Sequence, residues 1–152
     1  MSAQGPGQLL FSFVRHWSRR AAIGDPAIAE QGRLVLVTEA VGSLVALELP
    51  ATVNAVAHEL GIDQSGASRL IKSAADAGYL APAPGSADGR RREVSITAAG
   101  HAALEHAHAW QERVFAELTE GWTAQRRDDF QSAMADLIAR SHASVASHNR
   151  WL

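Results

Sequence analysis

Polar and basic side chains share one side of the stretch 64-QSGASRLIKSAADAGYL-80, which contains the single Lys of the chain. If this stretch is a helix with its Leu and Ile turned inward, a rotation of about 100° per residue turns these residues outward: Gln64, Ser65, Ser68, Arg69 and Lys72. Amide and guanidinium groups donate hydrogen bonds to base edges, and amides at a helix N-terminus hold phosphate. Gly66 has no side chain to keep the backbone away from a ligand. This chemistry predicts a helix that enters the major groove of DNA, with a solvated helix face as the alternative.

A second basic group, 88-DGRRR-92, follows a stretch rich in Pro, Gly and Ser. Arg90, Arg91 and Arg92 suit phosphates or a narrow, electronegative minor groove. Asp88 is predicted to orient the guanidinium of Arg90 by a charge-assisted pair. A lone run of Arg is more typical of a solvated loop, so the DNA interpretation depends on its position after the helix.

Two short helices around a Gly-containing turn are predicted to position the first group. Thr52 precedes 53-VNAVAHEL-60, whose apolar residues recur at helical spacing. Gly61 suits the left-handed cap that ends this helix, and Asp63 accepts hydrogen bonds from the amides that open the next helix. The inward side of that helix is predicted to hold Ala67, Leu70, Ile71 and Ala74. The pattern is typical of a helix-turn-helix.

A β-hairpin is predicted directly after this pair of helices. In 93-EVSIT-97, Val94 and Ile96 alternate with polar residues, as in a half-exposed strand. The preceding 81-APAPGSADGRRR-92 has the composition of a hairpin loop. A hairpin in this place is a wing, and its tip lies beside the groove that the helix is predicted to enter.

Long helices are predicted on both flanks. A first one runs from about Gln8 to Ile23 and ends at Gly24-Asp25-Pro26. The run 34-LVLV-37 fits a strand or a buried helical turn equally well, and Thr38 is predicted to cap a helix to about Glu48 that buries Val41, Leu44 and Val45. Thr97 caps a long helix with the apolar row Ala103, Ala107, Trp110, Val114 and Leu118. A last helix, from about Ala124 to Ser147, carries Phe130, Met134, Leu137, Ile138 and Val145.

The composition limits the classes of protein that remain. At 152 residues and 47% hydrophobic content, one domain is expected, and the absence of Cys excludes disulfides and Cys-ligated zinc. The N-terminal residues carry no Lys or Arg before a brief apolar run, so neither a signal peptide nor a membrane span is expected, and the protein is predicted to be cytoplasmic. The net charge of -2 argues against wholesale attraction to nucleic acid, but the basic residues between positions 61 and 93 are grouped.

The run 52-TVNAVAHELGIDQSGASRLIKSAADAGYL-80, followed by 88-DGRRREVSITAAG-100, resembles the MarR family of bacterial winged-helix transcription regulators. The resemblance implies a single, mainly α domain over residues 1–152 with a small β-wing: a winged helix-turn-helix at 38–97 between dimerisation helices at 8–32 and 98–150. It makes Gln64 to Lys72 the recognition helix and gives Ser68 and Arg69 the Ser-Arg positions of the family. Asp88 and Arg90 take the positions of its wing Asp and Arg.

The same resemblance implies a sequence-specific repressor that binds a palindromic double-stranded DNA operator as a homodimer, without catalysis or a cofactor. The candidates for the dimer interface, whose alternative role is intrachain core, are Leu9, Leu10, Phe13, Trp17, Phe130, Met134, Leu137 and Ile138. Many members of the family release DNA when a small aromatic or anionic molecule binds. The residues that could receive such a molecule here are Arg15, His16, Trp17 and Arg20, for which interface packing and solvated charge are the alternatives.

Some residues depart from the family pattern. Val41 and Gly42 stand where members often carry other residues before the helix-turn-helix, and Asp63 replaces the usual Ser cap. The long helix before this region is predicted to be interrupted at Asp25-Pro26. These changes bear on the effector pocket more than on DNA binding.

Other classes of function have weaker support. A zinc-responsive regulator of the same fold would use His101 and His108, which share a helix face, together with His142 or His148. A winged helix used for protein contacts is a further alternative. The signatures of nucleotide-binding enzymes and zinc proteases are missing, and Ser65 lacks the preceding Gly of a nucleophile elbow, so an enzyme is not expected.

Overall fold

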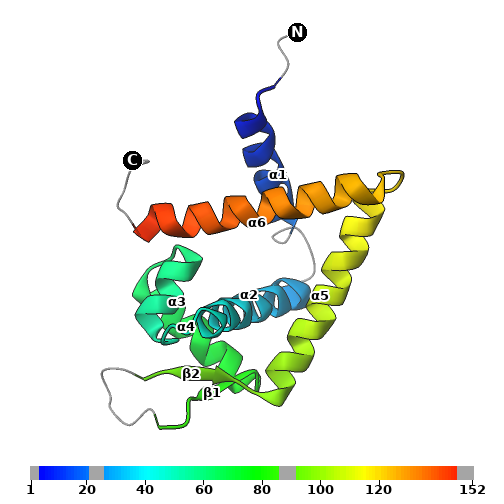
Figure 1. The fold of residues 1–152 in the computed structure, drawn as a ribbon. Helices are drawn as coiled ribbons and strands as arrows, with labels where there is room; N and C mark the ends of the chain where they lie inside the picture. Colours follow the sequence, from blue (N-terminus) through cyan, green and yellow to red (C-terminus); the bar gives the residue numbers. More distant parts are fainter. Residues whose placement is uncertain (1–3, 21–25, 86–91, 147–152) are drawn as a thin grey trace. The chain divides into compact units, whose positions relative to one another are not determined.

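The computed structural model describes residues 4–20, 26–85 and 92–146 (Figure 1). The described elements are α1 (Pro6–Arg20), α2 (Pro26–Ala46), α3 (Val53–Leu60), α4 (Gln64–Asp76), β1 (Leu80–Pro82), β2 (Val94–Ile96), α5 (Ala98–Leu118) and α6 (Ala124–Ala146). The predicted fold class, mainly helical with a small β-hairpin, is confirmed. The chain divides into two compact units, residues 1–108 and 109–152.

The core of the first unit lies where α2, α3 and α4 contact one another, with the hairpin against α2 and α4. Val37, Val41 and Val56 are fully buried there. Ala67 and Ala74 of α4 are equally buried, and their small side chains allow the backbone of α4 to lie close to the neighbouring helices. The polar side of α4 is thereby fixed in the direction away from this core.

The prediction for α2 was wrong at its N-terminus. The helix begins at Pro26, so 34-LVLV-37 is helical and Thr38 lies inside the helix instead of capping it. The buried Thr38 hydroxyl donates to the Leu34 carbonyl oxygen at 2.7 Å, one turn back, which satisfies the hydroxyl without ending the helix. Val41 and Leu44 are buried as expected, whereas Val45 is 55% exposed.

The helix-turn-helix matches the prediction closely. The Thr52 hydroxyl accepts from the Ala55 amide at 3.2 Å to open α3, and Gly61 ends that helix in the left-handed conformation with φ of 66°. The Asp63 carboxylate accepts from the Gly66 amide at 2.8 Å to open α4. A residue with a β-carbon would be strained at position 61, so the tight turn between the helices depends on this glycine.

The wing is a two-stranded antiparallel sheet in the described part of the chain. Leu80 pairs with Ile96, and Pro82 pairs with Val94. An additional bridge joins Thr52 to Glu93, so the segment before α3 extends the sheet by one pairing. The wing and the helix-turn-helix are therefore joined by backbone hydrogen bonds, including Val94 to the Ala51 carbonyl at 3.0 Å.

Few of the expected apolar positions on the flanking helices are buried. In α5 the buried residues are Gly100 and Leu104, whereas Trp110 and Leu118 of the predicted apolar row are 50% and 56% exposed. In the second unit, Phe115, Trp122 and Phe130 form ring contacts with centroids 5.8 Å apart. None of the helices described is long and apolar enough to cross a membrane.

The start of α1 differs from the prediction, whereas the predicted ends of α1 and α6 lie outside the described residues. α1 begins at Pro6 instead of Gln8 and is described to Arg20, while the predicted end at Ile23 and the break at Gly24-Asp25 lie outside the described residues. α6 begins at Ala124, as predicted, and is described to Ala146. Within the described residues neither helix has a buried side chain.

Candidate nucleic-acid interface

The predicted recognition surface lies on α4. Its apolar residues face α2 and α3, and Ala67, Ile71 and Ala74 are buried. The outward side is formed by the exposed side chains of Gln64, Ser65, Ser68, Arg69 and Lys72. Since these residues occupy the first turns of α4, their donors lie around its N-terminus, where the unpaired backbone amides also point outward.

None of these outward side chains has a hydrogen bond or ion pair with another described residue. The amide of Gln64 and the guanidinium of Arg69 thus keep their donors for solvent or a ligand. Arg69 and Lys72 carry the positive charge of this surface, and the negative charges on either side of it in sequence are Asp63 at the helix cap and Asp76 at the end of α4. The arrangement suits hydrogen bonding to base edges together with attraction to phosphate.

Gly66 has a local role beside the one predicted for it. A β-carbon at this position would lie 2.6 Å from the Asp63 carboxylate oxygen, which is the atom that caps α4. A larger residue would displace the cap, so this glycine protects the first turn of the helix as well as leaving space for a ligand. Sequence reasoning found the residue but not the contact that requires it.

The wing residues are only partly described. Arg92 is exposed at the base of the hairpin, next to Glu93, whose carbonyl accepts from the Ala83 amide at 2.8 Å. Asp88, Arg90 and Arg91 lie outside the described residues. The orientation of Arg90 by Asp88 therefore stays a prediction from the sequence.

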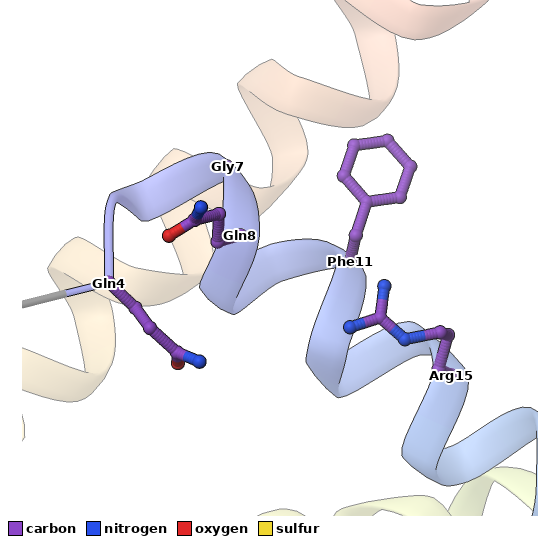
Figure 2. Close-up of a pocket in the computed structure, with 5 residues that line it drawn as sticks. All are labelled: Gln4, Gly7, Gln8, Phe11 and Arg15. Carbon is purple, nitrogen blue, oxygen red and sulfur yellow. The ribbon is translucent and has the colours of Figure 1, made fainter.

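The candidate ligand residues on α1 do not form a common cluster. Arg15 lies with Gln4, Gly7, Gln8 and Phe11 around a shallow hollow along one side of the helix (Figure 2). Because consecutive helical residues point about 100° apart, His16 and Trp17 face other directions than Arg15. The rings of His16 and Trp17 meet edge to face with centroids 5.9 Å apart. The side chain of Arg20 is not described, so the proposed ligand set stays untested.

The histidines considered for zinc are not gathered either. Among the described residues, no group of three or more His, Asp or Glu side chains lies close enough to hold a metal ion. His108 of α5 is 2.5 Å from the Glu39 carboxylate of α2, so one of its ring nitrogens is already engaged. His148 lies outside the described residues.

One contact of the site was missed at the level of sequence. Thr97 was predicted only as a helix cap, and its hydroxyl does accept from the Gly100 amide at 3.0 Å. The same hydroxyl donates to the Gly78 carbonyl oxygen at 2.5 Å, which joins the start of α5 to the turn that ends α4. The spacing of the two residues in sequence carries no signal of this contact, because it depends on the hairpin register.

Solved structures share this arrangement over nearly the whole chain, although no family sequence model and no curated protein matches it. A MarR family transcriptional regulator from Silicibacter pomeroyi is 22% identical, with 90% of this chain and 94% of that chain covered and a TM-score of 0.60. A MarR family protein from Bacillus stearothermophilus is 14% identical, with coverages of 90% and 92% and a TM-score of 0.62. A MarR family protein from Mycobacterium tuberculosis, in complex with salicylic acid, is 18% identical, with coverages of 90% and 98% and a TM-score of 0.60. The chain therefore has the winged helix-turn-helix fold of MarR family proteins.

Proposed function

We propose that this protein is a sequence-specific, double-stranded DNA-binding regulator of transcription in the MarR family, acting as a repressor and not as an enzyme. The observation that carries the proposal is the outward side of α4. Its amide, hydroxyl and cationic side chains are exposed and unpaired within the described part of the chain, and they sit on a helix held by a buried core. A helix in this position, beside a wing, fits the major groove of DNA.

A homodimer accounts for the exposed apolar residues outside the core. In a single chain, Leu9, Phe13 and Leu137 are 55%, 55% and 45% exposed, and Ile138 is 52% exposed. Large exposed apolar residues on helices that bury nothing of their own are typical of a protein interface. Two recognition helices in one dimer would contact successive major grooves, about 34 Å apart, and select a palindromic operator.

A small aromatic acid is the effector class that we propose. The structural neighbour from Mycobacterium tuberculosis was solved with salicylic acid, which supports this choice by analogy of fold. Arg15 offers a guanidinium for the carboxylate. Trp17 offers a ring for stacking, but it faces another side of α1 than Arg15, so the two residues of one chain do not contact the same ligand molecule. The ligand weakens DNA binding only if it binds more tightly to a dimer whose recognition helices are wrongly spaced for the operator. The difference between its affinities for the two forms of the dimer limits how far the DNA affinity falls. A broad panel of aromatic acids that leaves DNA affinity unchanged would exclude this regulation.

The test of the function is selection of bound duplexes from a random pool at two salt concentrations. We expect a palindromic consensus, and an affinity that falls steeply with salt because the protein releases counterions from phosphates. Enrichment of no duplex, together with a strictly monomeric protein, would refute the proposal. A partner protein bound with little salt dependence would indicate the alternative, a winged helix used for protein contacts.

A further inference from the structure

Thr97, directly before the first turn of α5, is hydrogen-bonded to two backbone carbonyl groups of the turn that ends α4. Gly78 ends the α4 region with φ of 85°. The Gly78 carbonyl oxygen accepts from the Thr97 hydroxyl, and the Tyr79 carbonyl oxygen accepts from the Thr97 amide at 3.0 Å. Thr97 thus holds two successive carbonyl groups of this turn through its own two donors.

Gly100 also allows the close contact between α5 and the end of α4, because it has no side chain. The residue is buried, and a β-carbon on it would lie 2.3 Å from the Tyr79 carbonyl oxygen and 2.8 Å from Ile96. The first of these neighbours is backbone, so it cannot rotate away as a side chain would. Ordinary contact begins at 3.4 Å, so a methyl group at this position forces a relative movement of about 1 Å between α5 and the end of α4.

The turn itself is held in place on its other side. Gln31 of α2 donates from its side-chain amide to the Tyr79 hydroxyl at 2.9 Å. Leu80, which follows Tyr79, is buried and pairs with Ile96 in the hairpin. Because α2 and the hairpin hold the turn, a change at position 97 or 100 is expected to move α5 against α4 and not to move the turn alone.

We infer that Thr97 and Gly100 are positioning residues that set the angle between the recognition helix and α5, and thereby the spacing of half-sites that the dimer accepts. The inference rests on the proposed function, because α5 belongs to the helices that we assign to the dimer. Neither residue contacts DNA in this proposal. Base preference within a half-site is set by the outward side of α4. The distance between half-sites is set by the contacts of Thr97 and Gly100 with the end of α4.

The test uses the full chain and its lack of cysteine. Ala75→Cys on α4 and Glu105→Cys on α5, both at exposed positions, provide unique labelling sites in a chain without other Cys. Spin labels at these sites, with labelled protein diluted into unlabelled protein, report the distance between α4 and α5 within one chain. Each substitution at position 97 or 100 is made in this labelled protein to measure the distance. The same substitutions, in protein without labels, are titrated with the selected operator and with versions whose central spacer is shorter or longer.

We expect Gly100→Ala to shift or broaden the α4–α5 distance and to move the preferred spacer by about one base pair, a step of about 3.4 Å along the duplex. Affinity for the wild-type spacing is expected to fall about tenfold, which corresponds to ~1.4 kcal/mol, with half-site base preference unchanged. Gly32→Ala is the matched control, since it adds the same methyl group to a helix at a position with nothing within 4 Å.

Thr97→Val and Thr97→Ser provide a second pair in case Gly100→Ala fails to fold. Valine removes the hydroxyl and is expected to act like Gly100→Ala, whereas serine keeps the hydroxyl and is expected to restore the wild-type spacing. An unchanged α4–α5 distance in Gly100→Ala and Thr97→Val overturns the inference, as does an equal loss of affinity at every spacer length. A wild-type protein that selects no palindrome refutes the proposed function first, and the inference falls with it.

Discussion

The apolar residues of the winged-helix core are buried, whereas most of those in α1 and α6 are exposed. In the core, Val37, Val41 and Val56 are fully buried by contacts within one chain, and the polar side of α4 is left exposed. In α1 and α6 most large apolar residues are exposed, with Phe11 at 65% and Ile138 at 52%, whereas Trp17 and Met134 are half-buried. Contacts within a single chain therefore bury the apolar residues of the core but leave most of those in α1 and α6 exposed. The difference indicates that the core is stabilised by contacts within the chain, whereas the long helices need another partner, for which we propose a second copy of the chain.

The largest expected effect comes from a charge introduced among the exposed apolar residues of α6. Leu137→Asp places a carboxylate among the apolar residues of the proposed dimer interface and is expected to cost roughly 3 to 5 kcal/mol of dimer stability. Sedimentation measurements should show a monomer, and operator affinity should fall at least ~100-fold. The core forms within one chain, so helical content should be retained.

Ser132→Asp serves as the control for this prediction, because it adds the same charge to an exposed polar position of α6. We expect it to leave the molecular mass in solution unchanged. If Leu137→Asp also remained a dimer, the long helices would not form the interface, and the contrast between the two regions would need another explanation.

A second prediction compares a buried valine and an exposed valine of α2. Val41→Ala removes methyl groups from a fully buried site and is expected to lower the free energy of unfolding by roughly 2 to 3 kcal/mol. Val45→Ala, at a position that is 55% exposed, should change it by less than ~0.5 kcal/mol. Urea unfolding followed by circular dichroism measures both. Equal losses would mean that Val45 is covered by a partner in solution.

These valines also show what the sequence was able to predict. Periodicity placed both on one face of a helix, but it does not reveal whether another element covers that face, so Val41 was predicted correctly and Val45 was not. The caps Thr52, Gly61 and Asp63 bind groups no more than four residues away in sequence, and for that reason α3, the turn and α4 were predicted accurately. The start of α2 was missed because Thr38 can satisfy its hydroxyl inside a helix as well as at a helix start.

The candidate site was predictable to a similar degree. The outward side of α4 follows from helical geometry once the buried side is known, and the structure leaves those side chains exposed. The contacts of Thr97 and Gly100 with the end of α4 were not predictable, because they join residues about twenty positions apart through the register of the hairpin. The ligand residues on α1 were chosen for their chemistry alone, and one helix cannot direct consecutive residues toward a common point.

A third prediction concerns the exposed polar side of the core. Arg69→Ala is expected to lower operator affinity roughly tenfold, or ~1.4 kcal/mol, and to relax the preference at the base pair that it contacts. Arg92→Ala, at the base of the wing, should weaken binding more uniformly across sequences and reduce the salt slope by about one phosphate contact. Competition titrations with single-base operator variants distinguish the two patterns. Identical patterns for both variants would contradict the division between base-reading helix and backbone-contacting wing.

The smallest expected effect separates two roles of one residue at the edge of that polar side. The Asp63 carboxylate caps α4 through the Gly66 amide, but it also places a negative charge next to a surface proposed to meet phosphates. Asp63→Ser keeps an oxygen that can accept the amide and removes the charge, so we expect nearly unchanged stability and an operator affinity raised by ~2-fold at low salt. Asp63→Ala removes both and should cost ~1 kcal/mol of stability. An affinity gain for serine that disappears at high salt would show that the charge acts by electrostatic repulsion, because screening reduces this term and leaves the cap unaffected. If serine instead lowered affinity at every salt concentration, the carboxylate itself would be a DNA ligand, accepting a hydrogen bond from a base amino group.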